Sequence, residues 1–515
     1  MRGRGWLLVG VGAALTAATL PTLVAAPRVP PSRGPLPTMP EVGALAYEIR
    51  DGDTGEIIPG KLTFDGIAGT PDPRFTHGDV GREEPGGIAA YNRVFSAVGT
   101  GALRVPVGTY DIYVSRGPEW ELYVARGVKV EPGGAEVRAQ IRHVVDTRGW
   151  LSADFHVHAA PSPDSRVPMI DRVHEFVSEG IDMIVSTDHN VVSDYAPIIQ
   201  ELDLGKYLAS ACGDEITTAT WGHFGAFPLP QSLERSGHGA IHAGARTADE
   251  IFRSVREVAP DAIVNVHHPR LEKAIGYFDL GGLDSPSDEA SRPGFSFDFD
   301  AVEVLNGYQD PDRKNIDKTI EDWFELLAHG HAVTATGNSD THHLTYNLAG
   351  YPRNYVRVAD DRPGHVSAAD VARAVKAHHV SFTTGPFLTL SVGGVQIGDL
   401  VAAPGGKVRA GIEVRAAPWV SVNLVRLYVD GKERQRWRVP PGVVDFRGVA
   451  QLELTRDAFV VARADGDRPM SPVIGDRNRF IVYPLALTNP VFVDVDGNGR
   501  WDPPIPHGAH GPRAR

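Results

Sequence analysis

The chain has 515 residues, more than one ordinary domain of roughly 100 to 200 residues, so we expect about three domains. Its 42% hydrophobic and 22% charged residues match a globular protein and exclude a mostly disordered chain. The 51 basic and 64 acidic residues give a formal net charge of −13, which argues against a general affinity for nucleic acid or anionic membranes.

Residues 1–26 have the pattern of an export signal. Arg2 and Arg4 precede an apolar run over residues 6–20, and two small alanines follow at 25–26. A membrane anchor is the alternative, but the run is short for a bilayer span and is interrupted by Gly and Thr. We expect a cleaved signal and an exported, periplasmic or extracellular protein that does not contact the membrane afterwards. The single cysteine, Cys212, permits no intrachain disulfide and is expected to be a buried, inert thiol.

The remaining chain divides by composition and by hydrophobic period. A proline-rich stretch predicts an extended linker. Short runs of alternating apolar and polar residues, separated by Gly, Pro and Asp turns, predict β-sandwiches. Strands that alternate with amphipathic helices predict an α/β barrel. The barrel would bring the carboxyl ends of its strands together at one mouth. The predicted parts are a linker at 27–41, an N-terminal β-sandwich at 42–147, the barrel at 148–387, a C-terminal β-sandwich at 388–503 and a tail at 504–515.

Sequence signals mark several helix ends in the predicted barrel region. Thr247-Ala-Asp-Glu250 and Ser367-Ala-Ala-Asp370 resemble capping signals, and Gly330 is a natural stop for a helix over residues 316–329. The predicted strands cover 152–156, 181–186, 207–213, 223–227, 262–266, 301–305, 332–336 and 380–383. Most of these strands end in polar residues.

Those polar residues include the ligand types that divalent metals need. His156 and His158 are two apart, so on a strand they share one face. A buried unpaired carboxylate is costly, and several carboxylates near a common mouth repel one another unless cations neutralise them, which favours metal over surface histidines. The further segments are Thr187-Asp-His-Asn190, Gly213-Asp-Glu215, Gly222-His223, His267-His-Pro269 and Asn338-Ser-Asp-Thr-His342.

As a set, these segments resemble the PHP (polymerase and histidinol phosphatase) family of metallohydrolases, and within it the carbaryl-hydrolase-like CehA/McbA group. The resemblance covers residues 149–390, and its motifs occur in the family's order: DFHVH, STDHN, GDEIT, GHF, VHHP and NSDTH. It implies a multidomain α/β plus β protein with a distorted (β/α)7 barrel, flanked by the two β-sandwiches and holding two or three metals.

The resemblance also implies roles for individual residues. His156, His158, Glu215 and Asp340 would surround one metal, and Glu215 would bridge to a second metal held by His223 and His268, with a hydroxide between the metals. His189 and His342 match ligands of a third metal, or would donate a proton to the leaving group if that metal is absent. The family's usual histidine after the HxH is missing, so Asp164 is the candidate third-site ligand.

Three neighbouring residues have open or supporting roles. Arg270 would either bind a substrate phosphate or carboxylate through its planar fork or form a structural salt bridge. Asp154 is expected to orient a ligand histidine rather than bind metal. His267 is expected to support the site from outside, because adjacent strand residues point to opposite faces.

The flanking parts carry two further signals. Residues 42–147 resemble the transthyretin-like or carboxypeptidase-regulatory sandwich, through Gly108-Thr-Tyr110 and Arg116-Gly-Pro-Glu119. Near the C-terminus, Asp494, Asp496, Asn498 and Asp502 stand at positions 1, 3, 5 and 9 of a calcium-type loop. Ile505 replaces the glutamate expected at position 12, so a plain acidic turn is the alternative to bound calcium.

Together these features predict an exported hydrolase of a small-molecule substrate. A hydroxide bridging zinc, manganese or iron would cleave a phosphoester, ester or carbamate bond. An amidohydrolase-type metalloenzyme is one alternative, although its usual bridging lysine is replaced here by Glu215. A non-catalytic exported binding protein with a vestigial barrel is another. Such a protein should have lost one of the ligands of the two principal metals, and all of these are present: His156, His158, Glu215, His223, His268 and Asp340.

Overall fold

The computed structural model describes the chain in six stretches. They are residues 40–76, 78–270, 275–307, 314–344, 348–475 and 480–505. The predicted export signal, nearly all of the predicted linker and most of the tail lie outside the described residues. Contacts divide the chain into Met1–Pro40 and one compact unit, Glu41–Arg515. The internal boundaries expected within that unit stay predictions.

The N-terminal strands form two sheets with an apolar core between them. β6, β1 and β9 make one sheet, and β3, β4, β5, β2, β7 and β8 make the other. Alternate residues of β1 are buried, as expected for a strand with one face on the core. The bounds are β1 (Val42–Asp51), β2 (Gly60–Gly66), β3 (Arg82–Glu84), β4 (Gly87–Ala90), β5 (Arg93–Ser96), β6 (Thr100–Pro106), β7 (Gly108–Ser115), β8 (Tyr123–Val130) and β9 (Ala135–Ile141).

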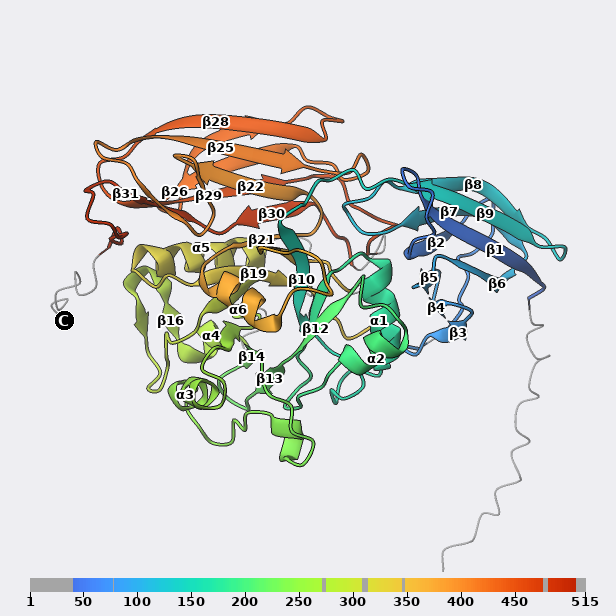
Figure 1. Ribbon diagram of the computed structural model, residues 1–515, viewed down its shortest axis with the longest axis horizontal. Helices are drawn as coiled ribbons and strands as arrows, with labels where there is room; N and C mark the ends of the chain where they lie inside the picture. The colour runs from blue at the N-terminus through green and yellow to red at the C-terminus, as the bar shows by residue number, and fades with distance from the viewer. Residues whose placement is uncertain are drawn as a thin grey trace, which may run out of the picture. The chain divides into compact units, whose positions relative to one another are not determined.

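The helices lie in the middle of the chain, from green to gold in Figure 1. The predicted capping signals are confirmed: Thr247 and Ser367 each form a capping box, at the starts of α3 and α6. The helices are α1 (Met169–Ser178), α2 (Ala196–Glu201), α3 (Ala248–Val258), α4 (Tyr277–Gly281), α5 (Lys314–Ala328) and α6 (Ala368–Lys376), with short 3-10 turns η1 (Ser236–Gly239) and η2 (Ser285–Ser287).

The strands of this middle part belong to several sheets. β12, β11, β10, β20 and β21 lie side by side in one sheet, and β13, β14, β15, β18 and β19 form a second sheet. Their bounds are β10 (Trp150–Val157), β11 (Met183–Ser186), β12 (Ala209–Cys212), β13 (Asp214–Thr217), β14 (His223–Phe227), β15 (Ile263–Val266), β16 (Leu283–Asp284), β17 (Glu289–Ala290), β18 (Ala301–Asn306), β19 (Thr334–Asn338), β20 (Arg353–Arg357) and β21 (Val380–Thr383).

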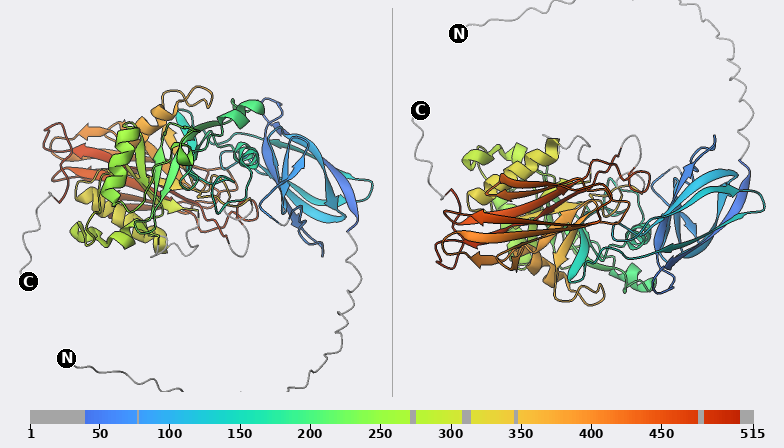
Figure 2. Two further views of the ribbon diagram at one scale, coloured as in Figure 1. Left: turned by 90° about the horizontal axis from the view of Figure 1, so that it is seen from below. Right: turned by 90° about the horizontal axis from the view of Figure 1, so that it is seen from above.

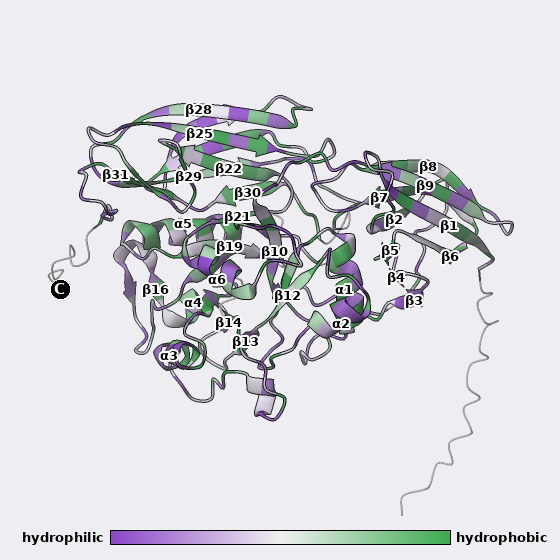
Figure 3. Cartoon of the chain, viewed as in Figure 1, coloured by the Kyte–Doolittle hydropathy of each residue, from purple (hydrophilic) through white to green (hydrophobic). Residues whose placement is uncertain are grey.

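The C-terminal strands continue the first of these sheets. β21 pairs antiparallel with β30, and the sheet then continues in the order β30, β29, β26 and β27. β23, β22, β25 and β28 form a separate sheet. The bounds are β22 (Phe387–Val392), β23 (Val395–Gln396), β24 (Leu400–Ala402), β25 (Lys407–Arg415), β26 (Leu424–Val429), β27 (Lys432–Arg438), β28 (Asp445–Glu453), β29 (Ala458–Asp465), β30 (Leu485–Thr488) and β31 (Val491–Asp494). Hydropathy alternates along strands such as β25 and β28 (Figure 3).

The predicted (β/α)7 barrel with flanking sandwiches is wrong. The described residues are 39% strand and 14% helix, with six α-helices, and the views in Figure 2 show the N- and C-terminal parts as strands. A barrel of that type needs parallel strands joined by helices. Here β10–β20, β13–β14 and β14–β15 pair antiparallel, and no helix separates β12, β13 and β14, whose residues are all described.

Two smaller findings complete the fold. Within the described stretches, no helix is both long enough and apolar enough to cross a bilayer. Cys212 is half-buried rather than fully buried, and burial raises the pKa of its thiol to about 11. The thiol therefore stays protonated at neutral pH, which agrees with the expected inert role.

Candidate metal centre

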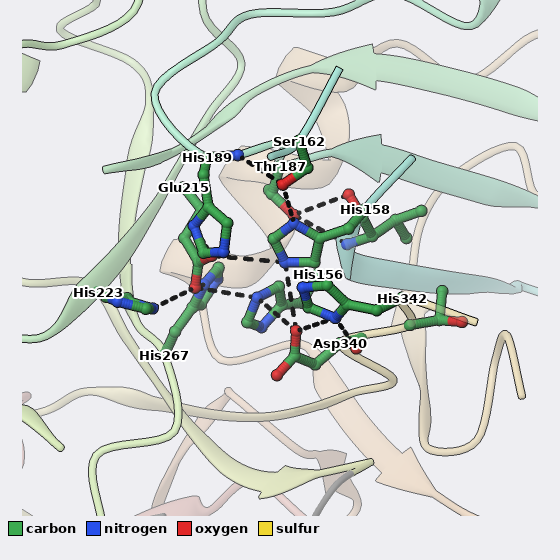
Figure 4. Close-up of polar contacts among 12 residues, drawn as sticks. His156, His158, Ser162, Thr187, His189, Glu215, His223, His267, Asp340 and His342 are labelled. Carbon is green, nitrogen blue, oxygen red and sulfur yellow. Dashed lines mark hydrogen bonds and ion pairs between the residues drawn. The ribbon is translucent and has the colours of Figure 1, made fainter. Parts of the chain in front are cut away.

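Two histidines at the end of β10 begin the site. His156 is in the strand and His158 directly follows it, so their side chains leave the same face, and both are fully buried. Their ring centroids are 5.0 Å apart. The predicted pair therefore lies side by side in the protein interior (Figure 4).

Glu215, on β13, is the centre of the site. Its carboxylate is 1% exposed and faces imidazoles on both oxygens (Figure 4). Around Oε1 lie His267 Nδ1 at 2.9 Å, His156 Nε2 at 3.0 Å, His223 Nδ1 at 3.3 Å and His268 Nε2 at 3.4 Å, and around Oε2 lie His189 Nδ1 at 2.7 Å and His158 Nε2 at 3.4 Å. One carboxylate thus faces two groups of nitrogen donors.

Asp340 supplies the second central carboxylate, just beyond β19. Its Oδ1 lies 3.2 Å from both His156 Nε2 and His158 Nε2 and 3.4 Å from His342 Nδ1. The backbone of Asp340 has φ +52°, and that of His268 has φ +28°, a region that non-glycine residues seldom adopt. Such strain persists where surrounding contacts fix it, and it clusters at functional sites.

Asp164 belongs to a third group of possible ligands, next to the residues around Glu215 and Asp340. Its Oδ2 lies 2.9 Å from His189 Nε2 and 3.3 Å from His342 Nε2, and its side chain is half exposed. Ligand atoms of Asp164, His158, His189 and His342 all lie within 4.8 Å of one another. The structure therefore brings together the three residues named for the third site, and it places His158, expected at the first metal, beside them.

The central residues have the features of a metal site. His156 Nε2, His158 Nε2 and His223 Nδ1 are buried and lie 3.0 to 3.4 Å from carboxylate oxygens without a well-directed hydrogen bond. An unsatisfied buried polar atom costs about 1 to 3 kcal/mol, which a bound cation would remove. Several overlapping His, Asp and Glu groups place their ligand atoms within 4.8 Å. These buried clusters could hold metal ions.

The charges of the two carboxylates agree with ligand chemistry. Burial alone would raise the pKa of Glu215, but His189 and His156 hold it well below its usual range. The pKa of Asp340 is likewise well below its usual range, because His156, His158 and His342 together outweigh the effect of burial. Both groups are therefore ionised at neutral pH, the form that binds metal.

Glu303 and Asn306, on β18, support the site and were missed from the sequence. Glu303 Oε2 lies 2.7 Å from His156 Nδ1, and Asn306 donates to Glu303 Oε1 and, at 3.0 Å, to Asp340 Oδ2. Both side chains are buried. The available signal was an acid in the middle of the apolar strand Ala-Val-Glu-Val-Leu.

His267 and Asp154 differ from their expected geometry. His267 was expected to face away from His268, but β15 ends at Val266, so strand alternation does not apply and both rings reach Glu215. Asp154 does not contact a ligand ring. Its carboxylate instead accepts backbone N–H groups of His156, Ser339 and Gly350 at 3.1 to 3.2 Å, and so fixes the backbone at two ligand segments.

Arg270 is held by acidic side chains. Its Nε donates to Asp322 Oδ2 at 2.8 Å and its Nη1 to Asp279 Oδ1 at 2.6 Å. Its side chain is 12% exposed, and Asp322 is fully buried. This placement favours the salt-bridge interpretation, and substrate binding by Arg270 stays a prediction without support from the geometry.

Substitution of Arg270 by methionine is expected to lower the free energy of unfolding by about 2 to 3 kcal/mol, because it leaves the buried Asp322 with fewer partners. Denaturant unfolding measures the change. The control is Arg253→Met, which removes an exposed pair with Asp249 on α3 and should cost less than about 1 kcal/mol. Equal losses in the two variants would contradict a structural role for Arg270.

The C-terminal acidic loop is a turn held by its own hydrogen bonds. Asp494 accepts the N–H groups of Gly497 and Gly499, and Asp457, outside the motif, accepts those of Val495 and Asp502. Asn498 donates to Asp496 and Asp502. Calcium binding by Asp494, Asp496, Asn498 and Asp502 stays a prediction.

Comparison with known proteins gives no assignment. No protein-family model matches the chain, and no curated protein matches it in sequence. The resemblance to the PHP family stays a prediction from six short motifs. The functional argument therefore depends on the geometry of the buried cluster.

Proposed function

We propose that this protein is an exported, metal-dependent hydrolase of a small-molecule phosphoester, ester or carbamate. The observation that carries the proposal is the position of Glu215, whose two carboxylate oxygens face separate groups of imidazoles. A bridging carboxylate suits a pair of divalent cations. A glutamate in this position also favours a hydrolase of this kind over an amidohydrolase-type enzyme with a bridging lysine.

The described residues allow two principal sites and a third. His156, His158 and Asp340 would hold one cation with Glu215, and His223 and His268 would hold another on its Oε1 side. Asp164, His189 and His342 would hold the third. Imidazole and carboxylate ligands suit zinc, manganese or iron. Such cations supply a nucleophile from water and polarise the bond to be cleaved.

The protein side chains would orient these ligands and handle protons. Glu303 fixes the ring of His156 through Nδ1, and Asn306 holds Asp340. Without a third cation, the Asp164 carboxylate would lie between the Nε2 atoms of His189 and His342. The pKa of His189 is raised to about 10, against the effect of burial, by Glu215 and Asp164. His189 or His342 could then donate a proton to the leaving group.

Metal content and hydrolysis together test the proposal. We expect purified mature protein to contain about two or three zinc, manganese or iron ions per chain and to cleave at least one member of a panel of p-nitrophenyl phosphates, aryl esters and aryl carbamates. Chelation should abolish this hydrolysis, and addition of one of the three metals should restore it. Substoichiometric metal, or hydrolysis that survives complete metal removal, would contradict the proposal.

A further inference from the structure

Arg172 contacts the backbone of two segments that carry predicted metal ligands, but not the side chain of any of these ligands. It stands on α1, and its side chain is completely buried. Its Nε donates to the carbonyl oxygen of His158 at 2.8 Å, its Nη2 to that of Thr341 at 3.0 Å and its Nη1 to that of His343 at 3.1 Å. One guanidinium therefore binds three backbone carbonyls from two distant segments.

Those two segments carry the predicted ligands. His158 directly follows β10, while Thr341 and His343 alternate with Asp340 and His342 beyond β19. The segments already meet through the N–H of His158, which donates to the carbonyl of Thr341 at 3.2 Å. Beyond β19 the chain has left its strand and adopts the strained backbone of Asp340, so its carbonyls depend on partners such as Arg172.

Glu175 fixes the orientation of the Arg172 guanidinium. Glu175, one turn along α1 and also fully buried, accepts a hydrogen bond from Nη1 of Arg172. A guanidinium is a rigid planar fork of five donors, whereas a lysine ammonium is a single point on a flexible stem. Lysine could keep the charge beside Glu175, but it could not reach all three carbonyls in the same geometry.

We propose that Arg172 is a positioning residue that sets the affinity of the centre for metal, by fixing the backbone of the segments that carry His158, Asp340 and His342. This inference rests on the proposed function, since it requires that the cluster binds metal. It assigns to α1 a role in the centre, although α1 itself carries none of the predicted ligands.

Arg172→Lys tests the inference through metal binding rather than activity. We expect the affinity for zinc and for manganese, measured by competition with a chromophoric chelator, to fall about 10-fold to 100-fold, as for residues that orient ligands. The control is Arg116→Lys. Arg116 is also buried and donates to two backbone carbonyls, those of Pro59 and of Val177 on α1, but to no ligand segment. It should keep wild-type affinity.

Circular dichroism and unfolding of the metal-free forms separate folding from positioning. If Arg172→Lys does not fold, Glu175→Gln decides instead, because it removes the guanidinium's counter-ion and should weaken metal binding about 3-fold to 10-fold. Wild-type affinity in the folded variant, or an equal loss in Arg116→Lys, would overturn the role of Arg172. Failure of the wild-type protein to bind either metal would instead overturn the proposed function.

Discussion

Substitution of Glu215 by glutamine is expected to strip the protein of most of its metal and to lower hydrolysis by at least about 100-fold. Loss of a group that only orients a ligand typically costs 10-fold to 100-fold in metal affinity or activity, so loss of the bridging carboxylate should cost more. Glutamine keeps the size of the side chain and creates no cavity, but it removes the charge and turns one acceptor into a donor. Elemental analysis after dialysis measures the metal, and rates on the best substrate of the panel measure hydrolysis.

The geometry around Glu215 explains the size of this effect. Its carboxylate faces six imidazoles, and these rings come from several strand ends and loops. An amide nitrogen placed at Oε1 or Oε2 would meet ring nitrogens at 2.7 to 3.4 Å. The variant would therefore lose attraction for cations on both sides at once, rather than at one site.

Glu179→Gln is the matched control for this substitution. Glu179 is equally buried, and it pairs with Lys61 and accepts a hydrogen bond from the Tyr351 hydroxyl, outside the metal cluster. We expect the variant to lose stability but to keep its metal. Unchanged metal content in Glu215→Gln would contradict the central role of Glu215. A similar loss of metal in both variants would show that the effect reflects unfolding.

Much of the candidate site could be predicted from the sequence, because its ligands follow strand ends. An HxH pair at the end of a strand can put two rings side by side whatever the topology, and His156 in β10 and His158 directly after it do so. Asp164 was found only because a histidine expected from the family pattern was missing. The expected direction of the His267 ring was wrong, because the alternation rule was applied beyond the end of β15, whereas its supporting role stays a prediction.

The overall fold was harder to predict, for a different reason. Hydrophobic period and capping signals report local structure, and they located α3, α6 and the strand at β18. They do not report which strands pair or in which direction. β10 pairs with β20, some 200 residues later, and β21 pairs with β30 of the C-terminal part, so the expected barrel was wrong. Long-range antiparallel pairing has no local signature in the sequence.

Glu303 illustrates a residue that only the structure could assign. An acid within an apolar strand is a signal of a buried partner, but the sequence does not name the partner, which here is His156, 147 residues away. Burial would raise the pKa of Glu303, yet His156 holds it below its usual range, so the carboxylate is ionised. An ionised acceptor at Nδ1 fixes the proton on that nitrogen and leaves Nε2 to face Glu215 and Asp340.

Glu303→Gln is therefore expected to lower metal affinity by about 10-fold to 100-fold, with a similar fall in hydrolysis at limiting metal. The neutral amide can still accept a hydrogen bond from His156 Nδ1, but more weakly, and it no longer favours the tautomer that presents Nε2. Competition with a chromophoric chelator measures the affinity. Excess metal should restore part of the activity, because the ligands themselves remain.

Asp182→Asn separates this effect from the cost of changing any buried acid. Asp182 precedes β11, where its carboxylate accepts hydrogen bonds from the backbone and hydroxyl of Ser152 rather than from a ligand histidine. Burial raises the pKa of Asp182 to about 7, so a neutral amide is a close substitute for its protonated form. The control should keep wild-type metal affinity. Because Glu303 is ionised and Asp182 is partly protonated, equal affinities in the two variants would show that the charge beside His156 does not tune the centre.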